Sequence, residues 1–349
     1  MKPNLLRGFN LGGWLSQSSL SDQHSKTFIT EHDFQQIAHW GFNSIRLPID
    51  SQWIFENQGT GPISPVRLDQ LCEYLSWAQK ANLIVVLDLH EVPWHSFAQP
   101  NMQTLFNHEV NMKQFCRLWT ELAAKLRFWK GEMWFDILNE PTAEQSSDWG
   151  RVALQAVQAI RSEDSERPIV IESTLWGSVF KLEDVVNQVQ GDRLIYSFHF
   201  YEPMWVTHQR APWWNEGVGY QEIVHYPGYL PRVQEYLNQP GLTSQAKNRL
   251  SFEGSCEWNA KSLRIYFEAV EKLQKQGYPL YCGEFGVYEG APRSTRLFWT
   301  KDVIQIFQDL QIGWSYWTYK WMDFGVVAKQ AQGTQDGFLD QEILQVLRG

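Results

Sequence analysis

Two rhythms of apolar and polar positions alternate along this chain. Short apolar runs, several of them apolar on both faces, are separated by longer segments in which apolar residues recur at the helical period. A strand that is apolar on both faces is typical of a parallel sheet covered by helices. The short runs predict eight strands, at residues 5–11, 44–49, 83–90, 133–140, 168–172, 194–201, 279–285 and 313–319.

The longer segments have recognisable helix ends. Thr30 can cap a helix that stops at Gly41, and a second helix follows Asn107 and stops at Gly131. Residues 260–276 and 294–312 predict two more helices, each followed directly by a strand, and residues 341–347 predict a short last helix. Strands that alternate with helices in this way predict an α/β fold, specifically a (β/α)8 TIM barrel. No linker or internal repeat divides residues 1–349, so one domain is expected.

One segment, residues 202–258, interrupts this rhythm. It is long and has no clear helical pattern, and such a connection is usually functional or disordered. Its aromatic content argues against disorder, so we expect it to line a binding site on the substrate side of the barrel. Its aromatic residues are Trp205, Trp213, Trp214, Tyr220, Tyr226, Tyr229 and Trp258.

Composition excludes several classes of partner. The formal net charge is −9 and the chain has no basic run, so nucleic acid and anionic membranes are poor partners. The first residues contain no apolar signal region, which favours a cytoplasmic location, with secretion after removal of a signal as the alternative. The four cysteines show no paired spacing and are expected to be reduced. Aromatic residues make up 15% of the chain, which suits a surface that binds flat ligands such as sugar rings.

Candidate chemistry lies at the strand ends, because catalytic groups of such barrels come from the carboxyl ends of several strands. Two carboxylates, Glu140 and Glu284, end the fourth and seventh strands, and proline stops the chain directly after Glu140. The polar and aromatic residues at strand ends are Arg46, Asp88, His90, Asn139, Glu140, His199, Tyr201, Glu284, Trp317 and Tyr319.

Two opposed carboxylates among aromatic rings suggest cleavage of a glycosidic bond, which needs an acid at the leaving oxygen and a nucleophile or base at the anomeric carbon. Arg46 and the phenol of Tyr201 would keep Glu284 ionised. A metal site is the other chemical interpretation, although the spacing lacks an HxH or HExxH arrangement. Its candidate ligands are His90, His95, His199, His208 and Glu140. Each of these residues could also be purely structural, as a strand cap, a core histidine or a buried ion pair.

Six motifs carry a resemblance. "LNEP" and "YCGEFG" resemble the acid/base and nucleophile motifs of glycoside hydrolase family 5, the cellulase-type retaining enzymes. "NSIRLPI", "VVLDLH", "SFHFY" and "YWTYK" resemble that family's motifs on strands two, three, six and eight. The resemblance implies that Glu140 is the general acid/base, that Glu284 is the nucleophile, and that no cofactor or metal takes part. It implies a surrounding substrate-binding shell of Arg46, His90, Asn139, His199, Tyr201 and Trp317.

The predicted function is therefore hydrolysis of β-linked glucans or gluco-oligosaccharides by a two-glutamate double displacement. Trp94 and Trp205, from the long loops after strands three and six, are expected to contact the substrate. These loops favour a pocket that is closed at one end, and "RGFNLGGWL" resembles the exo-acting β-1,3-glucanase branch. A β-mannan or other β-glycoside hydrolase, and an inactive carbohydrate-binding barrel, are the alternatives. The sequence indicates no obligate protein partner.

Overall fold

Eight parallel strands close into a barrel in the order β1 to β8, with β8 pairing with β1. The computed structural model describes residues 6–99, 103–217, 219–328 and 338–349. The predicted (β/α)8 barrel is confirmed. Leu5, where the first strand was expected to begin, and residues 100–102 of the loop after the third strand lie outside the described residues. The barrel strands are β1 (Arg7–Asn10), β2 (Ser44–Asp50), β3 (Ile84–Glu91), β4 (Met133–Asp136), β5 (Ile169–Glu172), β6 (Leu194–Phe200), β7 (Leu280–Phe285) and β8 (Gly313–Tyr316).

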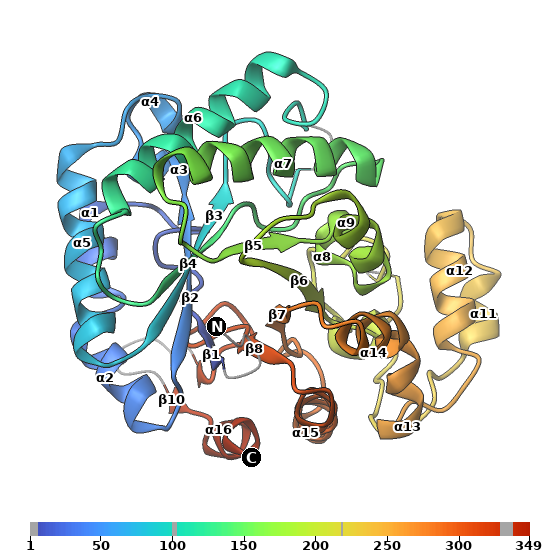
Figure 1. Ribbon diagram of the computed structural model, residues 1–349. Helices are drawn as coiled ribbons and strands as arrows, with labels where there is room; N and C mark the ends of the chain where they lie inside the picture. Colours follow the sequence, from blue (N-terminus) through green and yellow to red (C-terminus); the bar gives the residue numbers. More distant parts are fainter. Residues whose placement is uncertain (1–5, 100–102, 218, 329–337) are drawn as a thin grey trace.

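Helices surround the barrel, as Figure 1 shows. A small two-stranded sheet of β9 (Val327–Ala328) and β10 (Phe338–Leu339) precedes the last helix. The helices are α1 (Asp22–Thr27), α2 (Glu31–His39), α3 (Ser51–Ile54), α4 (Glu56–Gly59), α5 (Pro65–Lys80), α6 (Glu109–Leu126), α7 (Ser146–Glu163), α8 (Thr174–Gly177), η3 (Val179–Lys181), α9 (Leu182–Gln188), α10 (Met204–Thr207), α11 (Val233–Leu237), α12 (Ser244–Glu253), α13 (Ala260–Leu263), η4 (Arg264–Phe267), α14 (Glu268–Lys275), α15 (Arg293–Leu310) and α16 (Gln341–Arg348).

Helix ends follow the predicted caps closely where local chemistry decides them. Thr30 caps α2 in a capping box with Asp33, and Gly41 follows the helix with a φ of 92°. The helix predicted over residues 260–276 is instead divided into α13, η4 and α14. The fourth and eighth strands were predicted to be longer than they are, because regular pairing ends at Asp136 and Tyr316.

The barrel interior is built in layers, because side chains two apart on a strand share a face. Near the amino ends of the strands, an apolar layer fills the interior, and a polar layer lies two residues farther along: Asp88, Asp136 and Glu172 follow Val86, Trp134 and Val170. All three carboxylates are fully buried. The apolar layer comprises Leu6, Val86, Trp134, Val170, Ile195 and Tyr281.

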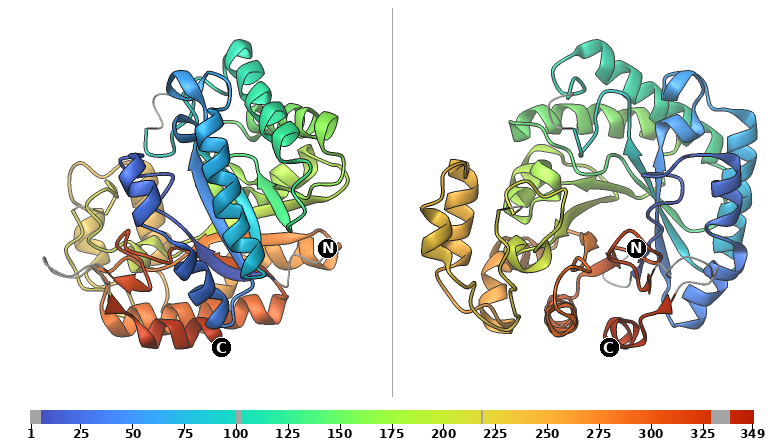
Figure 2. Two further views of the ribbon diagram at one scale, coloured as in Figure 1. Left: turned by 90° about the vertical axis from the view of Figure 1, so that its left-hand side faces the viewer. Right: turned by 180° about the vertical axis from the view of Figure 1, so that it is seen from behind.

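The segment at residues 202–258 is more ordered than predicted, since it contains α10, α11 and α12. Helices α11 and α12 lie on the outer side of the barrel beside α13, as both Figure 1 and Figure 2 show. Most of the segment's aromatic rings are buried against one another and against the core. No helix among the described residues is long and apolar enough to span a membrane.

Candidate active site

Arg46 lies at the centre of the polar layer and is fully buried. Its guanidinium contacts four carboxylates: Nε lies 2.9 Å from Asp136, Nη2 lies 3.0 Å from Asp88 and 2.8 Å from Glu172, and Nη1 lies 2.7 Å from Glu284. Burial would lower the pKa of Arg46, but the carboxylates outweigh it and the pKa is raised. Burial raises the pKa of both Asp88 and Asp136 well above the usual range. One cation therefore organises a cluster of buried carboxyl groups in which burial opposes the charge of Asp88 and Asp136.

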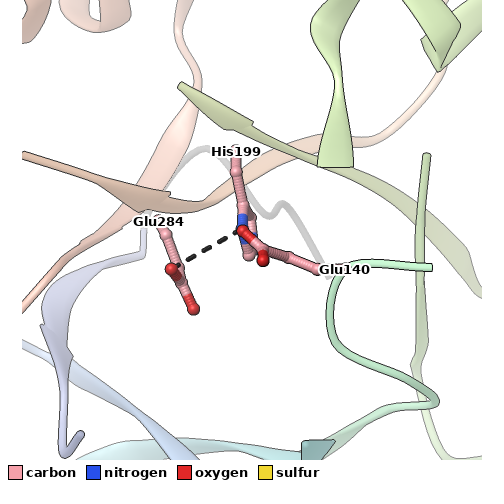
Figure 3. A group of neighbouring side chains, drawn as sticks. All are labelled: Glu140, His199 and Glu284. Carbon is pink, nitrogen blue, oxygen red and sulfur yellow. Dashed lines mark hydrogen bonds and ion pairs between the residues drawn. The ribbon is translucent and has the colours of Figure 1, made fainter. Parts of the chain in front are cut away.

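Glu140 and Glu284 face one another above this layer. Three atoms lie within 4.8 Å of one another: one carboxyl oxygen of Glu140, one carboxyl oxygen of Glu284 and one ring nitrogen of His199 (Figure 3). Carboxyl groups of retaining glycosidases lie about 5–5.5 Å apart, whereas inverting enzymes need about 6.5–9.5 Å to admit a water molecule. The close approach of the two glutamates therefore fits a retaining site.

Glu284 is held by two donors. It accepts hydrogen bonds from Nη1 of Arg46, at 2.7 Å, and from the Tyr201 hydroxyl, at 2.8 Å. Burial first, and then the Glu284 charge, raise the pKa of Tyr201 well above its usual range, so the phenol keeps its proton and donates. A cation and a hydrogen-bond donor therefore both face the Glu284 carboxyl group. Such a carboxylate can act as a nucleophile.

Glu140 has a different environment. It follows β4 in the left-handed region, with a φ of 45°, a backbone conformation that is uncommon outside glycine. Burial raises the pKa of its carboxyl group, and the charges of Glu284 and Glu172 add to this, while the hydrogen bond with His199 opposes it. The two facing carboxyl groups therefore have distinct surroundings: Glu284 faces Arg46 and Tyr201, whereas burial of Glu140 favours its protonated form.

The other predicted shell residues converge on the same mouth. His90 Nδ1 lies 2.6 Å from Asp88, and the His90 ring stacks parallel to Trp317 at a centroid distance of 6.0 Å. Asn139 Oδ1 accepts a hydrogen bond from Nη2 of Arg46 at 3.0 Å, which leaves its amide hydrogens for another acceptor. Tyr319 lies elsewhere, since its hydroxyl donates to Asp33.

Two predicted substrate contacts fare differently from the rest. Trp205 is 1% exposed, and its ring packs between Trp214 and Tyr220 at centroid distances of 4.7 and 4.9 Å. The prediction that Trp205 contacts substrate is wrong, because the aromatic rings of its own segment bury it. Trp94 is half-buried and packs against the core, and its contact with substrate stays a prediction.

Part of the long segment does border the mouth. Phe324 packs against Tyr201 at a centroid distance of 6.0 Å, and His208 and Trp213 pack against Phe324 at 5.7 and 6.3 Å. Trp213 is 49% exposed, so its ring remains accessible to a ligand. Tyr229 and Phe252 of the same segment are exposed as well, at 65% and 43%, and periodicity could not distinguish these exposed rings from their buried neighbours.

Glu172 is a site residue that the sequence analysis missed. Its carboxylate touches Arg46, His199 and the backbone N–H of Glu140. It ends the predicted fifth strand, so the criterion that selected Glu140 and Glu284 could also have selected it. Asn10, at the end of β1, was missed as well and accepts a hydrogen bond from Nη1 of Arg46 at 3.1 Å.

The metal interpretation finds little support in the positions of the histidines. Among the described residues, only Glu140, His199 and Glu284 bring three possible ligand atoms together. Arg46 already neutralises Glu284 with a fixed cation, which disfavours a second cation there. Of the other candidates, His95 contacts Gln103 and the Asn139 carbonyl, and His208 contacts Thr207.

Comparison with known proteins agrees with this site. The profile of the family "Cellulase (glycosyl hydrolase family 5)" matches residues 6–323. Endoglucanase C of Acetivibrio thermocellus is 34% identical over 91% of this chain and 92% of its own length. Cellodextrinase A of Ruminococcus flavefaciens is 28% identical over 87% of this chain and 82% of its own length.

Solved structures agree in fold. A glycoside hydrolase covers 100% of this chain and 99% of its own, with a TM-score of 0.80 at 22% identity. Thermotoga maritima Cel5A in complex with mannotriose covers 99% of this chain and 98% of its own, with a TM-score of 0.74 at 23% identity. The extent of the family match and the identity to Endoglucanase C decide the assignment: the chain belongs to glycosyl hydrolase family 5 and is a glycoside hydrolase.

Proposed function

We propose that this protein hydrolyses β-linked glucans and gluco-oligosaccharides with retention of anomeric configuration. The observation that carries the proposal is the pair of facing carboxyl groups, Glu140 and Glu284, which approach within 4.8 Å in contrasting environments. Relatives that align over nine-tenths of the chain are named endoglucanases, which supports a β-glucan as the substrate.

The proposed reaction has two steps. In the first, a carboxylate oxygen of Glu284 bonds to the anomeric carbon while the glycosidic bond breaks and the Glu140 proton passes to the leaving oxygen. In the second, Glu140, now a carboxylate, takes a proton from water, and the water oxygen displaces Glu284 from the anomeric carbon. Loss of the Glu284 charge in the intermediate removes one of the causes that raise the pKa of Glu140. This change helps Glu140 to act as a base in the second step.

We extend the proposal to cleavage at internal bonds of the glucan. Its support is the endoglucanase name of the relatives at 33–34% identity. This differs from the one-ended pocket that the loop lengths favour. A ring face at Trp317, which is stacked on His90, would lie against the sugar at the cleavage point.

Product analysis tests the proposal directly. The protein is incubated with cello-, laminari- and manno-oligosaccharides, and the products are separated by chromatography while NMR follows their anomeric configuration. We expect cleavage of a gluco-oligosaccharide at internal bonds, with the β-anomer released first. Release of the α-anomer would contradict retention, release of glucose alone from chain ends would contradict internal cleavage, and preference for manno-oligosaccharides would contradict the glucan.

Replacing Asn139 by alanine should reduce turnover more than substrate binding. Its free amide hydrogens can donate to the sugar 2-hydroxyl, and that bond strengthens in the transition state. We expect kcat to fall roughly 10- to 100-fold, as for the loss of one transition-state hydrogen bond, with KM changed by less than about threefold. Steady-state kinetics on a cello-oligosaccharide gives both values. Equal losses in kcat and in binding would contradict this role.

The pH dependence of kcat/KM should have an alkaline limb at a pH above the ordinary glutamate pKa of about 4.3. Glu140 must be protonated to act as an acid, its pKa is raised mainly by burial, and activity is lost as the pH rises through that pKa. A dinitrophenyl glycoside serves as the control, because its leaving group needs no proton and its glycosylation step should lack this limb. An alkaline limb at the ordinary glutamate pKa, or one shared equally by both substrates, would contradict the assignment.

A further inference from the structure

We propose that Glu172 is a positioning residue that sets where the catalytic proton resides, by fixing the tautomer of His199 and the backbone of Glu140. The inference rests on the proposed function and assigns a role to a third buried glutamate in the same site. Glu172 would not touch the substrate. It acts through the two residues that it holds.

Glu172 contacts two N–H donors, on Arg46 and on the Glu140 backbone, and one ring nitrogen of His199. Its Oε1 lies 2.8 Å from Nη2 of Arg46 and 3.0 Å from Nε2 of His199, and its Oε2 accepts the backbone N–H of Glu140 at 2.8 Å. The side chain is fully buried at the end of β5. Burial would raise the pKa of Glu172, but His199, Arg46 and the Glu140 N–H outweigh it, and the pKa is lowered. Glu172 is therefore an anion with no capacity to donate.

An anionic Glu172 requires a proton on Nε2 of His199, because a bare nitrogen there would face the carboxylate lone pairs. The other ring nitrogen, Nδ1, lies 2.9 Å from Oε1 of Glu140 and 3.6 Å from Oε2 of Glu284. Burial would lower the pKa of His199, but Glu172 and Glu284 outweigh it and the pKa is raised. Glu140 and Nδ1 of His199 thus share one further proton. It is bound either to Glu140, which is then a neutral acid, or to Nδ1, which makes the ring an imidazolium.

The histidine ring has little freedom to adopt another orientation. A Cβ atom at Gly177 or Gly283 would stand only 2.9 Å from the nearest atom of the ring. The absence of a side chain at these two glycines therefore allows the backbone to approach His199 closely. With the ring held, the choice of tautomer depends on its partners, and Glu172 is the partner that selects Nε2–H.

Glu172 also stabilises the unusual backbone of Glu140. The N–H that Glu172 accepts belongs to a residue with a φ of 45°. This part-buried N–H would otherwise lack its acceptor, at a cost comparable to a lost hydrogen bond. The Glu172 carboxylate thus positions both Glu140 and the histidine that shares its proton, His199.

Replacing Glu172 by glutamine should change which nitrogen of His199 carries the proton. Glutamine cannot accept at both oxygen positions, so its NH2 group must face either the Glu140 N–H or the two donors Arg46 and His199. In the second orientation Arg46 still faces the NH2 group, but the clash with His199 is relieved when the ring keeps a single proton, on Nδ1, and the proton that it shared with Glu140 passes to solvent. Nδ1 would then donate to Glu140 and hold it as a carboxylate, which removes the acid.

The test measures kcat/KM on two substrates, cellotetraose, whose leaving sugar needs a proton, and 2,4-dinitrophenyl β-cellobioside, whose leaving group does not. For Glu172→Gln we expect a loss of about 100-fold on cellotetraose, on the scale of general acid catalysis, and of less than about tenfold on the aryl glycoside. The matched control is Asp136→Asn, which removes a different buried carboxylate from Arg46. It should lower the activity on both substrates by similar factors.

Equal losses of Glu172→Gln on both substrates, or the same discrimination in Asp136→Asn, would overturn the proposal. If neither substrate is cleaved by the wild-type enzyme, the proposed function itself fails. A second measurement covers that case and also a Glu172→Gln variant that does not fold. In 15N-histidine-labelled wild-type protein, with His199 assigned from a His199→Asn variant, we expect Nε2 of His199 to carry a proton. A neutral ring protonated only on Nδ1 would overturn the role of Glu172.

Discussion

Replacement of Glu284 by glutamine is expected to abolish hydrolysis, with a loss in kcat/KM of roughly 10⁴-fold or more, on the scale found when a covalent nucleophile is removed from an enzyme. The amide is nearly isosteric but has no charge and cannot form the glycosyl-enzyme bond. Arg46 donates to one oxygen of this carboxylate and Tyr201 to the other, so one of these two donors would face the NH2 group of the amide. The measurement is the initial rate on an aryl β-cellobioside.

A matched control lies in the loop directly after β7. Glu289 is exposed, and Glu289→Gln makes the same chemical change without touching the cluster around Arg46. It should leave the rate within about twofold of the wild type, as for a surface substitution. A 2-fluoro aryl glycoside, which slows the second step, should attach covalently to the wild-type enzyme at Glu284, as seen by peptide mass analysis. A label on another residue, or an active Glu284→Gln enzyme, would contradict the nucleophile assignment.

Replacement of Glu140 by alanine is expected to produce the second largest effect. The loss on a cello-oligosaccharide should be about 10²–10⁴-fold, the range of general acid–base catalysis. The aryl glycoside should form its glycosyl-enzyme at a much less affected rate, because its leaving group departs without a proton. The second step would then be slow, since no base activates the water molecule. Transient kinetics should show a burst of aryl alcohol followed by slow turnover.

Azide provides the sharper outcome for the same variant. An anionic nucleophile needs no base and can enter the space that the side chain leaves, so azide should accelerate the slow step and yield the β-glycosyl azide. Glu144→Ala, on an exposed residue of the same loop, is the matched control and should show neither the burst nor the rescue. An α-azide product would contradict retention. Equal losses of activity on the cello-oligosaccharide and on the aryl glycoside in Glu140→Ala would contradict the acid role.

The barrel architecture could be predicted because its determinants are local or periodic. Runs that are apolar on both faces indicate buried parallel strands, and caps such as Thr30 and Gly41 are decided within one helical turn. The two glutamates could be found because each ends such a run. The same reasoning should have included Glu172, which ends β5 and whose carboxylate accepts the Glu140 N–H.

Burial within the long segment could not be predicted in this way. Trp205 and Trp213 have the same residue type and lie in the same segment, yet one is 1% and the other 49% exposed. Which ring faces solvent depends on how the rings pack together, and that packing involves Phe324 from a distant part of the chain. No period in the sequence records such an arrangement.

By itself, the sequence determined the succession of strands and helices and the positions of carboxylates at strand ends, because hydrophobic period and capping are short-range properties. Only the tertiary structure decided which buried charged groups interact with one another. Arg46 meets carboxylates from β3, β4, β5 and β7 because barrel closure brings those strand ends to one point. Electrostatic interactions in a buried cluster depend on distances between residues that are far apart in sequence. The different environments of Glu140 and Glu284 are therefore a property of the closed barrel.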